Sequence, residues 1–198
     1  MLNKSQGGSY ISNAGGFLSA FLGDAGLYLH GILHPREYLR RIMRDPLTEA
    51  YNRMAYNRFL NLQFGHAVRT GEPFSAVVVD LTLKPVNDAY GHPMGDGVLK
   101  YVTEVLFSYG DTFRTGGDEF ALLLPGVPKA EADRYAAEIL SLNGKENVID
   151  GKALSFNLSA GVASFPEDKP RTASELISIA DQRLYQHKRQ NGNGRNAT

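Results

Sequence analysis

The run from Phe74 to Val79 constrains most strongly what this chain can fold into. It is apolar except for Ser75, follows the turn residues 71–73 and is followed by Asp80. A short β-branched run of this kind is typical of a strand buried on both faces, which needs helices on each side of its sheet. Apolar residues recur at helical spacing in five segments that can supply them: 36–44, 52–70, 98–107, 130–142 and 172–189, the last with Thr172 or Ser174 as its N-cap.

Three further segments are predicted to be strands. Residues 112–114 and 120–124 flank a tight turn at Gly116-Gly117, which predicts a hairpin, and residues 153–165 alternate as a strand does. The order helix, strand, helix, two strands, helix, strand, helix favours an α/β (α+β) sandwich with a largely antiparallel sheet.

Composition limits the classes of function. The 198 residues fit one domain with a short appendage, and 42% of them are hydrophobic, enough for a buried core. The absence of cysteine excludes disulfides, thiolate nucleophiles, iron–sulfur clusters and Cys-ligated zinc. The formal net charge of zero gives no general attraction to nucleic acid or to an anionic membrane.

Residues 1–35 are predicted to be a flexible lead with a possible short helix, because seven of the first 31 residues are glycine. The apolar stretch 17–33 contains Asp24 and His30, which argues against a membrane span, and no signal-peptide pattern is present. We therefore expect a cytoplasmic protein. His30 and His34 have a spacing that could ligate a metal, but no third ligand is near, and we interpret them as exposed side chains.

The residues that most suggest chemistry are the acids around the predicted hairpin turn. Asp118 and Glu119 follow the two glycines, and adjacent strand residues point to opposite faces unless the turn twists them together. A Gly-Gly-Asp-Glu turn can also be an ordinary solvated turn. Asp80, however, ends a hydrophobic strand, where an isolated carboxylate is costly. If the two strands are neighbours, Asp80 and Asp118 meet at one edge and suit Mg²⁺, which prefers carboxylate oxygen, water and phosphate ligands.

Several separated motifs, from about residue 36 to 196, together resemble the GGDEF domain, the diguanylate cyclase family. They occur in the family's order: Asp45-Pro46-Leu47-Thr48 with 51–53, Lys84 to His92 with Gly95-Asp96, Gly116-Gly117-Asp118-Glu119-Phe120, 158–163, and Ala180-Asp181 with Leu184-Tyr185 and Lys188. We therefore take residues 36–198 as a GGDEF domain. The resemblance implies a fold similar to the palm of polymerases and class III cyclases, with a central, mostly antiparallel, five-stranded sheet flanked by helices.

The resemblance implies that two GTP molecules are condensed into cyclic di-GMP with release of two pyrophosphates, in a homodimer. Carried over by position, Mg²⁺ (or Mn²⁺) would be held by Asp80, the Leu81 carbonyl, Asp118 and Glu119, with Asp118 and Glu119 also the catalytic residues. The GTP-binding residues would be Asn87 and Asp96 at the guanine edge, His92 in the pocket, the turn glycines Gly116 and Gly117, and Lys188 and Arg195 at phosphate. Each has a plainer interpretation: Asn87 or Asp96 as a helix cap, His92 as loop, Lys188 as a solvated charge.

The chain also departs from the family pattern. Between the strand and Lys84 one residue is missing, and with it a second acid; we place the gap after Leu81, which keeps Asp80 at the metal position. Phe107 and Gly110 stand where the family's Arg-x-x-Asp product-inhibition site lies, so we expect no feedback by that route. Thr115 replaces the usual Tyr, Glu49 the usual Gly, and a longer C-terminal segment precedes Arg195.

Three functions remain open from the sequence. The first is an active diguanylate cyclase; the second is a catalytically impaired module that binds GTP or a protein partner as a regulatory or dimerisation domain. An enzyme that makes a different cyclic nucleotide is a third. Neutral net charge permits all of them, because seven acids meet three bases in 80–119, while 36–58 and 181–198 are each basic by three. We expect no nucleic acid partner and no membrane insertion, and the sequence identifies no sensor.

Overall fold

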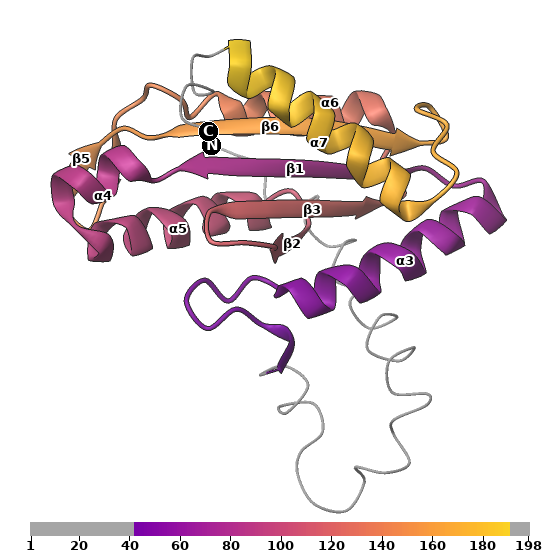
Figure 1. Ribbon diagram of the computed structural model, residues 1–198, viewed down its shortest axis with the longest axis horizontal. Coiled ribbons are helices and arrows are strands. Elements are labelled where there is room, and N and C mark those ends of the chain that lie inside the picture. The colour runs from indigo at the N-terminus through magenta and orange to yellow at the C-terminus, as the bar shows by residue number, and fades with distance from the viewer. Residues whose placement is uncertain (1–41, 191–198) are drawn as a thin grey trace, which may run out of the picture. The chain divides into compact units, whose positions relative to one another are not determined.

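The computed structural model describes residues 42–190. Helices and strands alternate along this part of the chain (Figure 1) in the following order: α3 (Arg53–Thr70), β1 (Phe74–Thr82), α4 (Lys84–Tyr90), α5 (His92–Phe107), β2 (Asp111–Arg114), β3 (Glu119–Pro125), α6 (Lys129–Leu140), β4 (Asn147–Ile149), β5 (Lys152–Leu154), β6 (Asn157–Phe165) and α7 (Ala173–Gln190). Of the described residues, 44–190 belong to one compact unit. The predicted lead at 1–35 and its histidines lie outside the described residues.

The main sheet has four antiparallel strands in the order β2-β3-β1-β6. The predicted fold class is therefore confirmed, but the expected count of five strands is wrong. The predicted strand 153–165 is two strands, because β6 pairs with β1 only from Asn157, which lies opposite Thr82 at the end of β1. The residues before it pair with β4 instead and form a separate two-stranded sheet.

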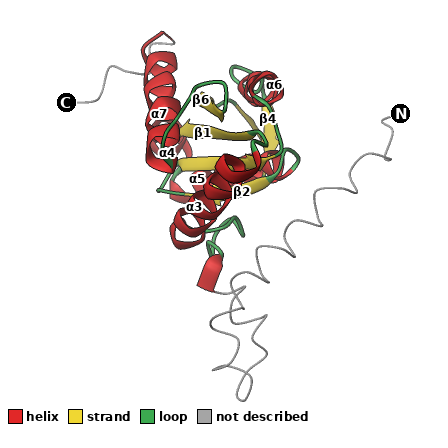
Figure 2. Ribbon diagram, turned by 90° about the vertical axis from the view of Figure 1, so that its right-hand side faces the viewer, coloured by secondary structure: helices red, strands yellow, loops and turns green. Residues whose placement is uncertain are grey.

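Each face of the sheet is covered by a pair of helices. Helices α3 and α7 pack on one face, and α5 and α6 pack on the other. Figure 2 shows α7 and α6 on opposite sides of the sheet. Alternate residues of the central strand are divided between the faces: Val77, Val79 and Leu81 belong to the core under α5 and α6, so Val78 and Asp80 point toward α3 and α7. This alternation fixes which side chains can share a site.

The stretch between β1 and the middle of α5 is more helical than the sequence predicts. Helix α4 was not predicted, and α5 begins at His92 rather than at 98. Pro85 and Pro93 each occupy the first turn of a helix, where proline is tolerated because its missing N–H has no intrahelical partner there. Gly91, at φ 83°, separates the two helices. Asn87 and Asp96 therefore lie within helices and are not helix caps.

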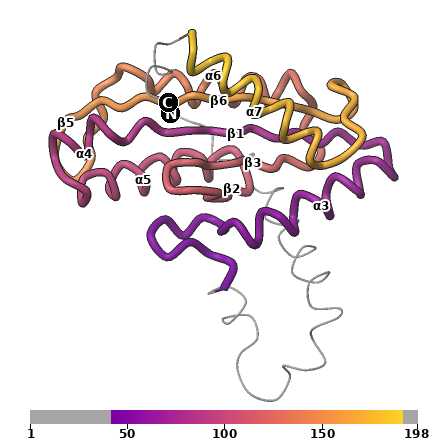
Figure 3. The backbone as a smooth tube through the Cα atoms, viewed as in Figure 1, coloured from indigo at the N-terminus to yellow at the C-terminus, as the bar shows by residue number. Residues whose placement is uncertain are grey.

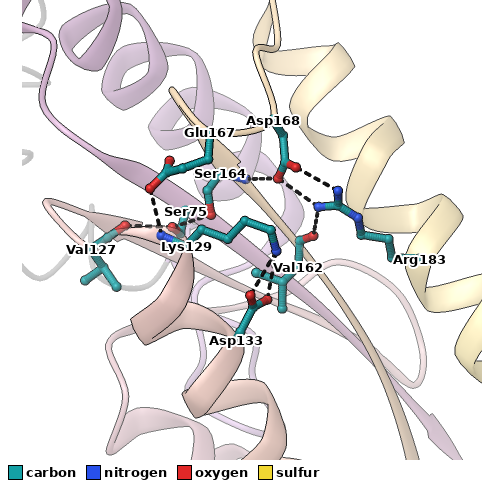
Figure 4. Close-up of polar contacts among 9 residues, drawn as sticks. All are labelled: Ser75, Val127, Lys129, Asp133, Val162, Ser164, Glu167, Asp168 and Arg183. Carbon is teal, nitrogen blue, oxygen red and sulfur yellow. Dashed lines mark hydrogen bonds and ion pairs between the residues drawn. The ribbon is translucent and has the colours of Figure 1, made fainter.

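Helix α7 is held against β6 at two places. Gly161 allows close approach, because a Cβ atom built on it would lie 2.0 Å from the carbonyl oxygen of Ala180. Further along, Arg183 donates to both carboxylate oxygens of Asp168 at 2.7 Å and to the carbonyl of Val162 (Figure 4). As predicted, Thr172 caps the helix, accepting from the N–H of Glu175 at 3.0 Å. These contacts fix where the C-terminal turn of α7 lies.

The connection between α3 and the sheet is largely aromatic. The ring of Phe113 on β2 contacts those of Tyr51, Tyr56 and Phe59 at centroid distances of 5.2 to 5.9 Å. Asn52 caps α3 by accepting from the N–H of Ala55. Within residues 42–190, no helix is long and apolar enough to cross a membrane.

Candidate functional site

The turn between β2 and β3 carries the first group of predicted site residues. The N–H groups of Thr115 and Gly116 both donate to the carbonyl of Glu119, at 2.9 and 3.3 Å, which closes the turn. The Arg114 side chain also stabilises the turn: its Nε and one terminal nitrogen donate to the carbonyl of Gly117 at 3.2 and 2.6 Å. The turn is thus held by backbone and guanidinium together, which orders the acids that follow it.

The predicted N-terminal motif supports this turn. The Asp45 carboxylate accepts from the N–H and the hydroxyl of Thr48 and from a terminal nitrogen of Arg114, at 2.7 to 2.9 Å. Burial opposes ionisation of Asp45, but the hydrogen bonds from Thr48 and Arg114 outweigh it and hold its pKa below the usual range. Sequence reasoning gave Arg114 no role; its signal was its place directly before Thr115 and the glycines.

Gly116 is needed for the space it leaves. A Cβ atom at this position would lie 2.5 Å from a carboxylate oxygen of Glu119, whereas one on Gly117 would meet nothing within 4 Å. Neither glycine is among those with positive φ. The Glu119 carboxylate therefore lies against Gly116, and the two glycines are not equivalent.

Asp80 and Glu119 face the same side of the sheet. They are direct cross-strand partners on β1 and β3, a pairing that brings Cβ atoms to about 5 Å. The Asp80 side chain is 13% exposed, and its Oδ2 lies 2.6 Å from Nζ of Lys188 at the end of α7. The structure thus brings together the predicted residues Asp80, Glu119 and Lys188 from β1, β3 and α7. It pairs Asp80, a predicted metal ligand, with Lys188, a predicted phosphate ligand.

Leu81 and Asp118 are joined through their backbones. The N–H of Leu81 donates to the carbonyl of Asp118 at 2.9 Å. In an antiparallel strand the N–H and C=O of one residue point to the same side, so the Leu81 carbonyl points toward the turn while its side chain is fully buried. β1 runs regularly to Thr82, and Leu83 alone connects it to α4.

The second group of predicted residues lies on α4 and α5, beyond the end of β1 (Figure 3). The amide oxygen of Asn87 is buried and has no hydrogen-bond partner. A Cβ atom built on Gly95 would lie only 2.0 Å from this oxygen, so the glycine leaves room for the Asn87 amide. His92 and Asp96 are exposed. The site thus has an unused buried acceptor beside two polar side chains open to solvent.

Helices α3 and α7 enclose a pocket of about 370 Å³ over the face that carries Asp80 and Glu119. Among its lining residues are four that sequence reasoning did not assign, Arg53, Tyr56, Asp181 and Tyr185, together with Glu119 and Lys188. Burial, and then the nearby Glu119 carboxylate, raise the pKa of Asp181. Burial, with a smaller contribution from Asp181, raises the pKa of Tyr56 to about 12. Asp181 and Arg53 belong to the motifs that resemble the family, and this was the sequence signal that could have identified them as pocket residues.

The predicted residues therefore form two groups at one end of the sheet. Within residues 42–190, no three His, Asp or Glu side chains come together as a ready-made metal-binding group. Arg195 lies outside the described residues.

Comparison with known proteins decides the family. The family model described as "Diguanylate cyclase, GGDEF domain" matches residues 42–194. The chain belongs to the GGDEF family. The diguanylate cyclase DosC of Escherichia coli K12 is 34% identical over 156 residues, which cover 75% of this chain and 34% of DosC. This GGDEF chain therefore spans about a third of that curated relative.

Solved GGDEF domains share the fold. The GGDEF domain of TpbB (or YfiN) from Pseudomonas aeruginosa is 32% identical with a TM-score of 0.67, covering 74% of this chain and 89% of that one. The GGDEF domain of DgcB from Caulobacter crescentus, solved in complex with c-di-GMP, is 25% identical with a TM-score of 0.68, covering 75% of this chain and 91% of that one. Both similarities agree with a mixed α/β fold in which helices flank an antiparallel sheet.

Proposed function

We propose that this GGDEF domain is a diguanylate cyclase that condenses two GTP molecules into cyclic di-GMP. In each of two steps a ribose 3′-oxygen attacks the α-phosphorus of the other GTP, the hydroxyl proton leaves, and pyrophosphate departs. Family membership and the name of the relative DosC support the reaction class. Two domains must face each other, because each supplies one GTP, so we propose a homodimer as the active form, in the cytoplasm where GTP is available.

The observation that carries the proposal is the buried, unpartnered amide oxygen of Asn87. Leaving such an acceptor unsatisfied costs about 1–3 kcal/mol, so a bound ligand that donates to it recovers that cost. Guanine carries an exocyclic amino group and an N1–H, and the exposed carboxylate of Asp96 can accept from the same edge. Adenine offers no matching pair of donors, which favours GTP over ATP. His92 would line this pocket.

The donor set at the sheet end fits Mg²⁺ (or Mn²⁺). Asp80 and Glu119 are cross-strand partners on one face, and the Leu81 carbonyl and Asp118 adjoin the same turn. Mg²⁺ is commonly held by one or two carboxylates and completes its shell with water and substrate phosphates, so no cluster of three acids is required. When bound, the ion neutralises charge that develops at the α-phosphoryl group and lowers the pKa of the attacking hydroxyl.

The remaining roles concern the chain's own residues. We assign Asp118 and Glu119 to positioning and accepting the proton of the 3′-hydroxyl, Gly116 and Gly117 to the close approach of nucleotide to the turn, and Lys188 with Arg195 to the phosphates. Because Phe107 and Gly110 replace the Arg-x-x-Asp site, we also propose that cyclic di-GMP does not inhibit through that route.

The test is to incubate the protein with GTP and Mg²⁺ or Mn²⁺ and to identify the product by chromatography and mass spectrometry. We expect cyclic di-GMP and pyrophosphate in a ratio of one to two. Absence of product at high protein concentration contradicts the proposal; calorimetric GTP binding without turnover then identifies a nucleotide-binding module.

A pair of glycine variants tests the guanine pocket. Gly95→Ala displaces Asn87 and should weaken GTP binding by about tenfold or more, the equivalent of one lost buried hydrogen bond. Gly97→Ala on the same helix is the control, because its Cβ would meet the carboxylate end of Asp150 and not Asn87. Equal GTP affinity in both variants would contradict the role of Asn87.

A further inference from the structure

The Asp80 carboxylate already holds a cation that belongs to the chain. Nζ of Lys188 lies 2.6 Å from its Oδ2, a charge-assisted contact, and the side chains of Asp80 and Lys188 are only 13% and 29% exposed. This ion pair ties the C-terminal turn of α7 to the sheet. Most surface ion pairs are weak because solvent screens them, and this burial makes the contact more effective.

The groups around this ammonium are those that attract a cation. Glu119 is the cross-strand partner of Asp80 on one side, and Ser159 is its partner on the other, so all three side chains face α7. Ser159 is 1% exposed, and its hydroxyl oxygen is buried without a hydrogen-bond partner. The sheet end therefore offers two carboxylates and an unused hydroxyl around the position that Lys188 reaches.

We propose that the Lys188 ammonium occupies the divalent-cation site of this domain and competes with the metal for Asp80 until a nucleotide triphosphate draws it away. The inference rests on the proposed function for the kind of cation and for the triphosphate. A triphosphate competes with Asp80 for Lys188, because the ammonium that forms the 2.6 Å contact is also the group that attracts phosphate oxygens. Metal and triphosphate binding are therefore coupled through one side chain: the triphosphate removes the competitor of the metal.

The coupling has a direction that can be measured without turnover. Metal binding and the Asp80–Lys188 ion pair are linked: the factor by which the ion pair weakens metal binding equals the factor by which bound metal weakens the ion pair. Anything that removes Lys188 from Asp80 therefore strengthens metal binding. Replacing Lys188 with an uncharged residue mimics the action of the triphosphate. The nucleotide-free variant should then bind a divalent cation more tightly than the wild type.

The experiment is titration of the nucleotide-free protein with Mn²⁺, followed by the electron paramagnetic resonance signal of the free ion. We expect Lys188→Gln to lower the Mn²⁺ dissociation constant by about fivefold or more, the equivalent of one partly buried ion pair. Arg189→Gln is the matched control, because it removes a positive charge from the same turn of α7 without touching Asp80. It should change the constant by less than about twofold.

A second variant tests the site itself. Adding Asp80→Asn to Lys188→Gln should abolish the gain in Mn²⁺ affinity. An unchanged affinity in Lys188→Gln, an equal gain in Arg189→Gln, or a gain that survives Asp80→Asn each overturns the proposal. Because GTP is absent from the titration, a gain in Mn²⁺ affinity that depends on Asp80 supports the inference even if the protein makes no cyclic di-GMP. Turnover of GTP without such a gain refutes this inference and leaves the proposed function standing.

Discussion

Substituting Gly161 tests whether the close seating of α7 on β6 stabilises the domain. An added Cβ would lie 2.0 Å from the carbonyl oxygen of Ala180 and 2.4 Å from the amide nitrogen of Leu184, both backbone atoms of α7. Ordinary contacts begin at 3.4 Å, so the carbonyl of Ala180 must move away by roughly 1.4 Å. Overpacking of this kind costs about 1–3 kcal/mol, and we expect Gly161→Ala to lower the free energy of unfolding by that amount.

The assay is urea unfolding followed by circular dichroism, with Gly65→Ala as the matched control. Gly65 lies inside α3, and its added Cβ would meet only the flexible end of Arg69, at 3.6 Å. This control should gain about 0.5–1 kcal/mol, because alanine is the better helix former. If Gly161→Ala is as stable as the wild type while Gly65→Ala shows its gain, the close packing of α7 on Gly161 is refuted.

Two acidic residues should affect stability with opposite signs. Burial opposes ionisation of Asp168, but hydrogen bonds from Arg183 and the Ser164 N–H lower its pKa, so its stabilisation is present above the unfolded pKa and is lost as the pH falls through the folded value. Asp168→Asn should therefore cost about 1–3 kcal/mol at pH 7 and little at pH 2 in urea unfolding, and an equal loss at both pH values would contradict this linkage. Burial and Glu119 raise the pKa of Asp181, so Asp181→Asn should stabilise by a few tenths of a kcal/mol at pH 7 and not at pH 3; a loss at pH 7 would contradict the repulsion.

The sequence predicts elements well where periodicity is long and uniform. Helices α3, α6 and α7 and strands β1 and β3 lie within one or two residues of their predicted bounds, because helical and strand patterns differ over such lengths. The prediction fails where one hydrophobic pattern continues across the end of a strand. The alternation from 153 onward continues through β5 and β6, yet only the pairing with β1 shows that they are separate strands. Helix α4 was not predicted, because it has seven residues with one buried apolar side chain, Val86, and so shows no helical periodicity.

The candidate site was predictable in its residues but not in their contacts. The positions of Asp80, Glu119 and Lys188 followed from motif order, whereas their convergence depends on strand register and on where α7 ends. Periodicity carries no information on either, because both are set by tertiary packing. The same limit explains why Arg53 and Asp181 were quoted within motifs and yet received no role in the α3–α7 pocket.

Three glycines in the motifs act through the space that they leave and not through their backbone conformation. Gly95, Gly116 and Gly161 all have ordinary φ values, so none is required for a left-handed turn. Each instead leaves the volume of a Cβ to another group: the amide of Asn87, the carboxylate of Glu119 and the backbone of α7, respectively. Two of those groups are proposed ligands, and the third carries Lys188. These three glycines therefore position the chemistry by absence of volume, and their alanine variants should alter binding or helix position before they alter turn geometry.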